Sequence, residues 1–84
     1  MNHYLVIYRS ITQAQMASRY LKKFGINNQI QRTPIGLTER GCSYSLRIPE
    51  RYWGSAFNEL RELKPSYYKV FKSAGSSYSE VVVS

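Results

Sequence analysis

The sequence "HYLVIYRSITQ", residues 3–13, joins an apolar run to a helix-start signal. Residues 3–8 are rich in β-branched and aromatic side chains and contain no glycine or proline, which predicts a buried strand. Ser10 is followed three residues later by Gln13, a capping-box spacing in which each side chain can satisfy a backbone N–H of the first turn. This stretch therefore predicts a β-strand that leads directly into an α-helix.

The predicted helix extends to about residue 24. Apolar residues recur at steps of three and four, which predicts one stripe that packs on a sheet. The members of the stripe are Ile11, Ala14, Ala17, Leu21 and Phe24. Gly25 is expected to end the helix in the left-handed conformation that glycine adopts without strain.

The remaining chain repeats this pattern. Residues 26–33 alternate weakly and are polar on one face, which predicts a strand at a sheet edge. A loop follows at 34–41, and "CSYSLRI", residues 42–48, alternates clearly as a strand. Pro49 and Glu50 are typical of a first helical turn. The second helix is expected to end before Pro65, and residues 67–73 are predicted to form the last strand.

The order strand, helix, strand, strand, helix, strand predicts an α+β fold. We expect a ferredoxin-like βαββαβ domain over residues 1–73, in which two helices cover one face of a four-stranded antiparallel sheet. The other face would be open. Residues 74–84 are expected to form a C-terminal tail or a short extra strand, with "EVVV" as the strand-like part.

The composition limits the classes of partner. A net charge of +7, from 12 basic and 5 acidic residues, favours anionic partners such as nucleic acid, although the dispersed charges fit a role in solubility equally well. One cysteine cannot form an internal disulfide, and no segment resembles a signal peptide or a membrane span. We therefore expect a cytoplasmic protein with no membrane partner.

The single cysteine, Cys42, stands where a long loop re-enters the sheet. Flanking cations lower the pKa of a thiol, and hydrogen-bond donors stabilise a thiolate. The candidate residues around Cys42 are Thr38, Arg40, Gly41, Ser43 and Arg47. The alternative is that Cys42 is a small apolar filler of the core, as free cysteines often are.

Metal and cofactor sites are not expected. Zinc requires three or four protein ligands, and the chain has one cysteine and one histidine. Catalysis by a Cys–His pair would require His3 to lie beside Cys42. The first and third strands are expected to be neighbours, so this arrangement stays open as an alternative.

Three segments together carry a family resemblance: "YRSITQAQMASRYLKKFGI", "TPIGLTERGCSYSLRI" and "YYKVFK". Over residues 4–72 the chain resembles the small selenium/sulfur carrier-like family, through Ser10 and Ala14, the Thr33–Pro34 pair and the Gly41–Cys42 pair. The resemblance implies that Cys42 holds sulfur or selenium as a persulfide or selenopersulfide and passes it between donor and acceptor proteins. It implies a carrier or accessory protein rather than a stand-alone enzyme.

The chain departs from the family pattern at three positions. Ile11 replaces the threonine of the helix start, Ile35 stands where arginine often follows Thr-Pro, and Ser43 replaces a glycine after the cysteine. Arg32 or Arg40 would have to replace the missing arginine as an anion-binding group.

A second class of function also fits the expected fold. An open sheet face with basic charge and aromatic side chains is typical of nucleic-acid-binding modules. If Leu5 and Ile7 face the helices, Tyr4, Val6 and Tyr8 line that open face. The third strand lacks the paired aromatic residues of an RNA-recognition motif. A protein-interaction module that forms a homodimer through the open face or the "EVVV" run is a further alternative.

Overall fold

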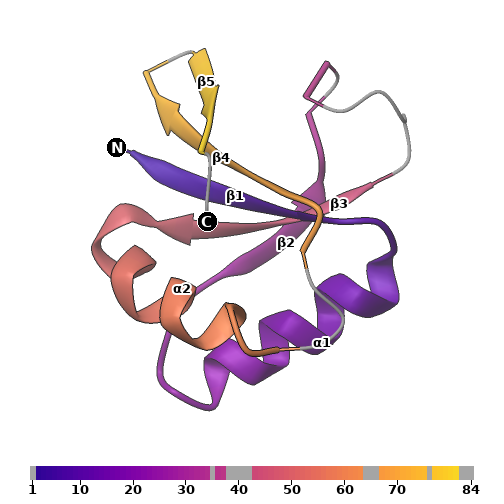
Figure 1. Ribbon diagram of the computed structural model, residues 1–84, viewed down its shortest axis with the longest axis vertical. Helices are drawn as coiled ribbons and strands as arrows, with labels where there is room; N and C mark the ends of the chain where they lie inside the picture. The colour runs from indigo at the N-terminus through magenta and orange to yellow at the C-terminus, as the bar shows by residue number, and fades with distance from the viewer. Residues whose placement is uncertain (1, 35, 38–42, 64–66, 76, 82–84) are drawn as a thin grey trace.

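The computed structural model describes residues 2–34, 36–37, 43–63, 67–75 and 77–81. Within them the chain forms five strands and two α-helices, which are labelled in Figure 1, and one short 3₁₀ turn. The elements are β1 (His3–Tyr8), α1 (Ile11–Lys22), β2 (Gln29–Arg32), β3 (Tyr44–Pro49), the 3₁₀ turn η1 (Glu50–Tyr52), α2 (Trp53–Leu60), β4 (Lys69–Ala74) and β5 (Ser77–Glu80).

The five strands form one antiparallel sheet in the order β2-β3-β1-β4-β5. Both helices lie on the same side of this sheet (Figure 1). The α+β class is confirmed, and β2 lies at an edge as predicted. The expected count of four strands was wrong, because β5 extends the sheet beyond β4.

The fifth strand is held by backbone pairing rather than by an apolar sequence. Gly75 has φ +65° and permits the tight reversal between β4 and β5, a conformation that few other residues adopt without strain. In the register of the pair, Ser73 faces Tyr78 and Phe71 faces Glu80. The strand lies at Ser77–Glu80, before most of the "EVVV" run of residues 80–83, and residues 82–83 of that run lie outside the described part of the chain.

Helix α1 begins and ends largely as predicted. The Ser10 Oγ accepts a hydrogen bond from the Gln13 backbone N–H at 3.2 Å, and Gly25 has φ +73°. The predicted apolar stripe was wrong at its two ends, where Ile11 is 42% and Phe24 is 54% exposed. Phe24 lies beyond the last helical residue, so the helical period no longer directs its side chain.

The main core lies between the sheet and the helices. It is formed by sheet residues that face the helices, by helix residues that face the sheet, and by one residue of the connection between α1 and β2. These residues are Val6, Tyr8, Ala14, Ala17, Leu21, Ile26, Leu46, Ile48, Ala56, Leu60 and Val70. Asn28 joins helix to sheet, because its amide accepts from the Ser18 hydroxyl and donates to the Ile26 carbonyl at 3.1 Å. At one margin the Tyr4 ring stacks on Trp53 with 4.2 Å between centroids.

The second face of the sheet carries a smaller apolar cluster. Leu5 and Ile7 are fully buried and Phe71 is 7% exposed, and Leu37 and Tyr78 pack against them. Figure 1 shows the β4–β5 hairpin and the segment after β2 rising on this side, away from the helices. The expectation of an open second face was therefore wrong at its centre.

The facing of β1 also differs from the conditional prediction. Val6 and Tyr8 belong to the helix-side core, whereas Leu5 and Ile7 belong to the second-face cluster. Strand β1 is apolar on both faces, as expected for a strand that is covered on both sides. The sequence of such a strand contains no signal that shows which face is turned to the helices. Tyr4, Val6 and Tyr8 therefore do not form a platform for stacking bases.

Candidate functional site

The strand ends beside Cys42 are fixed by the pairing of β2 with β3. The Thr33 backbone N–H donates to the Ser43 carbonyl at 3.1 Å, which extends the ladder one step past Arg32 and Tyr44. The hydroxyls of Thr33 and Ser45 lie 2.7 Å apart and share a hydrogen bond. This end of the sheet therefore contains small hydroxyl side chains, of which Ser43 and Ser45 are buried, close in sequence to Cys42.

Four of the predicted site residues lie outside the described part of the chain: Thr38, Arg40, Gly41 and Cys42. Their proposed roles stay predictions. Of the other four, Thr33 and Ser43 are brought together by the ladder, and Pro34 follows directly. The Pro34 carbonyl accepts from the Leu37 N–H at 3.3 Å, and Leu37 packs on the second-face cluster, so this turn anchors the start of the loop on that face.

Arg47 is not brought to this end of the sheet. It lies on β3 opposite Leu5 and Gln29, four residues after Ser43. Four steps along a strand span about 13 Å. Arg47 therefore lies along β3 away from Ser43, and the role of Arg47 toward Cys42 stays a prediction.

His3 is also remote from Ser43. It pairs with Pro49 and Ser73, at the end of β1 opposite to the Tyr8–Tyr44 pair. Five steps along β1 separate His3 from Tyr8, about 17 Å. Ser43, the described residue next to Cys42, lies beyond that far pair, so the Cys–His alternative gains no support.

Two residues at this end were not among the predicted site residues. Ser45 is fully buried and is the hydroxyl partner of Thr33. Its place on the second face follows from the alternation of β3, but its partner depends on the register of β2. Tyr8, opposite Tyr44 on the helix side, is 1% exposed, and its hydroxyl has no hydrogen-bond partner among the residues described.

The environment of Tyr8 affects its ionisation. Burial raises the pKa of the Tyr8 phenol above its usual value near 10, and repulsion from the Tyr67 phenolate adds to the rise. The unfolded chain would ionise at the ordinary pKa of about 10. The contribution of neutral Tyr8 to the free energy of unfolding is therefore fully present below about pH 10. It is lost progressively as the pH rises above that value, by at most about 1.4 kcal/mol per pH unit.

Replacement of Tyr8 by phenylalanine tests this environment. We expect Tyr8→Phe to raise the free energy of unfolding by about 1 kcal/mol at neutral pH, because it removes a buried hydroxyl that no described group satisfies. The gain should grow at about pH 11, where wild type loses stability. Urea unfolding at both pH values measures the effect. Tyr68→Phe, at an exposed ring, is the control, and a Tyr8→Phe variant less stable than wild type would contradict the assignment.

The described residues offer no group of three or more histidine, cysteine, aspartate and glutamate side chains that could hold a metal ion. Cys42 and Glu39 are not among them. Neither helix in the described ranges is long and apolar enough to cross a bilayer.

Comparison with known families gives one match. The family model described as "Putative Se/S carrier protein-like" matches residues 3–75. The chain belongs to this Se/S carrier-like family. The match includes both the Thr33–Pro34 and the Gly41–Cys42 pairs, and it ends at Gly75, before β5. No curated protein and no solved structure gives a significant match.

Proposed function

We propose that the chain carries sulfur or selenium on Cys42 between a donor and an acceptor protein. The match of the Se/S carrier-like family model to residues 3–75 carries this proposal. The single cysteine supports it, because a carrier needs one thiol and no partner cysteine in the same chain. The chain would act as a carrier or accessory protein, not as a stand-alone enzyme.

The transfer chemistry is two balanced substitutions at sulfur. The Cys42 thiolate attacks the outer sulfur of a donor persulfide, forms a new S–S bond and releases the donor thiolate. An acceptor thiolate then attacks the outer sulfur of the Cys42 persulfide and regenerates the Cys42 thiolate. No oxidant or reductant is consumed.

The hydroxyl groups at the end of β2 and β3 suit this chemistry. Thr33 and Ser45 form a hydroxyl pair one ladder step from the point where Cys42 joins Ser43. Hydroxyl and backbone N–H donors stabilise a thiolate or persulfide anion by charge-assisted hydrogen bonds. Arg40 would be the cation closest to Cys42 along the sequence, whereas Arg47 faces another part of the sheet.

Incubation with a persulfide donor tests the proposal. Intact mass should rise by one sulfur atom, and both a reductant and an acceptor thiol should reverse the gain. Cys42→Ser should take up none. The double variant Cys42→Ser/Ser79→Cys is the matched control, since it keeps one thiol but places it on the exposed edge strand β5. Equal uptake and delivery by this control, or no uptake by wild type from any donor, would contradict the proposal.

A further inference from the structure

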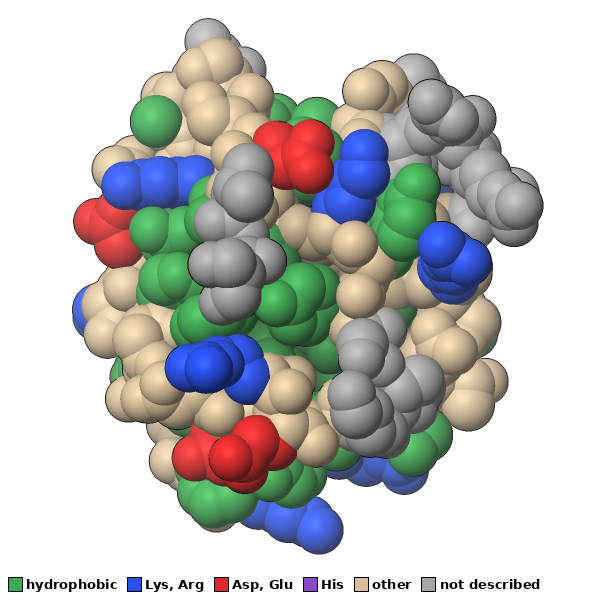
Figure 2. Space-filling model, in the orientation of Figure 1, with side chains coloured by type: hydrophobic (Ala, Val, Ile, Leu, Met, Phe, Trp, Pro, Cys, Tyr) green, Lys and Arg blue, Asp and Glu red, His purple; other side chains and the backbone are tan. Residues whose placement is uncertain are grey.

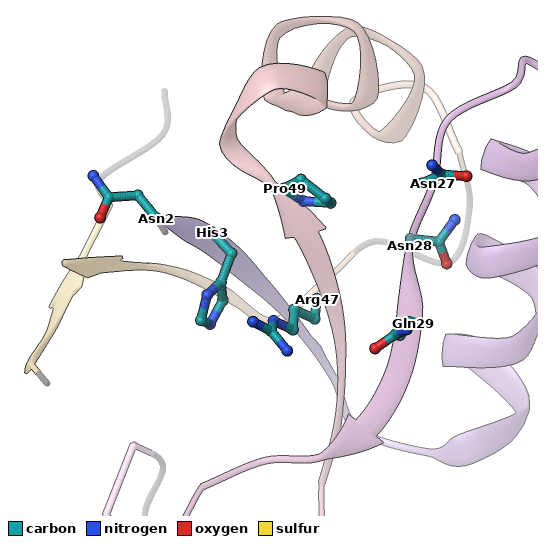
Figure 3. Close-up of a pocket in the computed structure, with 7 residues that line it drawn as sticks. All are labelled: Asn2, His3, Asn27, Asn28, Gln29, Arg47 and Pro49. Carbon is teal, nitrogen blue, oxygen red and sulfur yellow. The ribbon is translucent and has the colours of Figure 1, made fainter. Parts of the chain in front are cut away.

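A second polar site lies at the end of the sheet remote from Ser43. It is a hollow of about 330 Å³ lined by residues from β1, β3 and the chain entering β2 (Figure 3). Arg47, Pro49 and His3 lie toward the end of the β1–β3 ladder that is opposite to Ser43, and neither Thr33 nor Ser43 lines the hollow. A ligand bound in this hollow would therefore contact other residues than Thr33 and Ser43.

Three side chains converge on the hollow from neighbouring strands. Arg47 pairs in register with Gln29, and His3 lies on the next strand with its side chain on the same face. Figure 3 shows the Arg47 side chain extending from β3 toward the His3 ring, with the Gln29 amide turned to the same side. A guanidinium, an imidazole and an amide therefore border one small volume.

The remaining described lining residues are three asparagines, Asn2, Asn27 and Asn28, and one proline, Pro49. Asn28 is held by its bonds to Ser18 and Ile26, so it shapes the wall and is not available to a ligand. Asn27 donates weakly to the Tyr52 hydroxyl at 3.4 Å and is exposed. Pro49 is the one apolar residue among the described lining residues. None of the lining residues in the described part of the chain is acidic.

Arg47 has no ion-pair partner within the described ranges. The nearest carboxylate in the sequence, that of Glu50, pairs with Lys72 at 3.1 Å, and the carboxylate of Glu80 on β5 lies 3.9 Å from Lys69. Both acids that flank this part of the sheet are thus engaged by lysines. Arg47 is therefore a positive group at the edge of a hollow to which the described residues contribute no carboxylate.

We propose that this hollow binds a small molecule that carries an oxyanion group, either phosphate or carboxylate. The planar guanidinium of Arg47 presents two parallel N–H donors that match two oxygens of such a group. Gln29 supplies an amide donor beside it, one strand away. The volume is at the lower end of the range for small-molecule pockets, about 300–1,000 Å³, which limits the ligand to a small metabolite.

Nucleic acid fits this surface less well than a small oxyanion does. The basic side chains do not gather into one stripe, and Figure 2 shows them separated by acidic and apolar groups on the face in view. The aromatic residues of β1 that would stack bases face the helices or pack beside them. A compact hollow with one guanidinium fits a single oxyanion better than a polyanionic strand.

NMR titration of the ¹⁵N-labelled chain with inorganic phosphate, and separately with acetate, tests the proposal at constant ionic strength set by chloride. We expect saturable shifts confined to Arg47, Gln29, His3 and their neighbours with at least one of the two probes. Arg47→Gln should weaken this binding about tenfold or more, because it removes a charge-assisted hydrogen-bond donor. Phosphate and acetate together show which oxyanion is preferred.

Arg51→Gln is the matched control, because Arg51 is exposed on η1 and does not line the hollow. It should leave the affinity unchanged, and both variants should unfold at the wild-type temperature. Linear shifts without saturation, equal binding by Arg47→Gln, or equal loss in Arg51→Gln would overturn the proposal. Shifts that appear only with a single-stranded RNA oligonucleotide and spread over other basic residues would also overturn it.

Discussion

Leu46→Ala should lower the free energy of unfolding by about 2–5 kcal/mol. Leu46 is fully buried on β3, paired with Val6 on one side and Ile30 on the other, and its side chain enters the helix-side core. Removal of a buried isobutyl group loses its transfer free energy and leaves a cavity that close-packed neighbours fill only in part. The expected loss is a large share of the total stability of a chain this small.

Thermal and urea unfolding measure this loss. The melting temperature should fall by at least about 8 °C, since about 1 kcal/mol shifts a domain of this size by 4–8 °C. Met16→Ala is the control, because Met16 is 42% exposed on α1 and its truncation should change stability by less than about 0.5 kcal/mol. A loss for Leu46→Ala no larger than for Met16→Ala would show that β3 does not form the centre of the core.

The sequence predicted the elements wherever one local signal was strong. Strand β3 alternates cleanly, and in the structure Leu46 and Ile48 enter the helix-side core while Ser45 lies on the other face. The Ser10 cap of α1 followed from its spacing to Gln13. In both cases the side chain that determines the local structure lies within a few residues along the chain.

Prediction was incomplete where distant strands determine the outcome. Strand β5 has the sequence SYSE and is held by backbone pairing to β4, so its side chains carry little strand signal. The two faces of β1 could not be distinguished, because both are apolar and both are covered. The second face is covered by Leu37, which comes from a loop, and by Tyr78, which comes from β5, a segment for which the sequence left a tail and a short strand open.

In the candidate site, too, the sequence did not predict which residues distant strands bring together. Arg47 was grouped with Cys42 because five positions separate them in the sequence, but an extended strand carries Arg47 about 13 Å past Ser43. The structure places Arg47 instead beside Gln29 and His3, which lie 18 and 44 positions away in the sequence and meet it only through strand pairing. Strand β3 therefore links two distinct ends of the sheet, one bordered by hydroxyls and one by a guanidinium.

Phe71→Ala should lower the free energy of unfolding by about 3–5 kcal/mol. Phe71 lies on β4 between Leu5 of β1 and Glu80 of β5, and its ring belongs to the second-face cluster with Leu5 and Ile7. An open face, as the sequence suggested, would leave this ring in water and make its truncation nearly neutral. The buried cluster makes the opposite prediction, so this variant decides between the two descriptions of the second face.

The hairpin gives Phe71→Ala a second measurable effect. Strand β5 pairs with β4 alone, and Tyr78 is its contact with the cluster. Loss of the Phe71 ring should therefore speed hydrogen exchange at the Val81 amide, which donates to the Val70 carbonyl at 2.8 Å, more than exchange in β3. Phe57 lies on the helix side in a stack with Trp53, so Phe57→Ala should leave hydrogen exchange at the Val81 amide unchanged. A loss of stability below about 1 kcal/mol for Phe71→Ala, with β5 exchange unaltered, would mean that the second face contributes no core of its own.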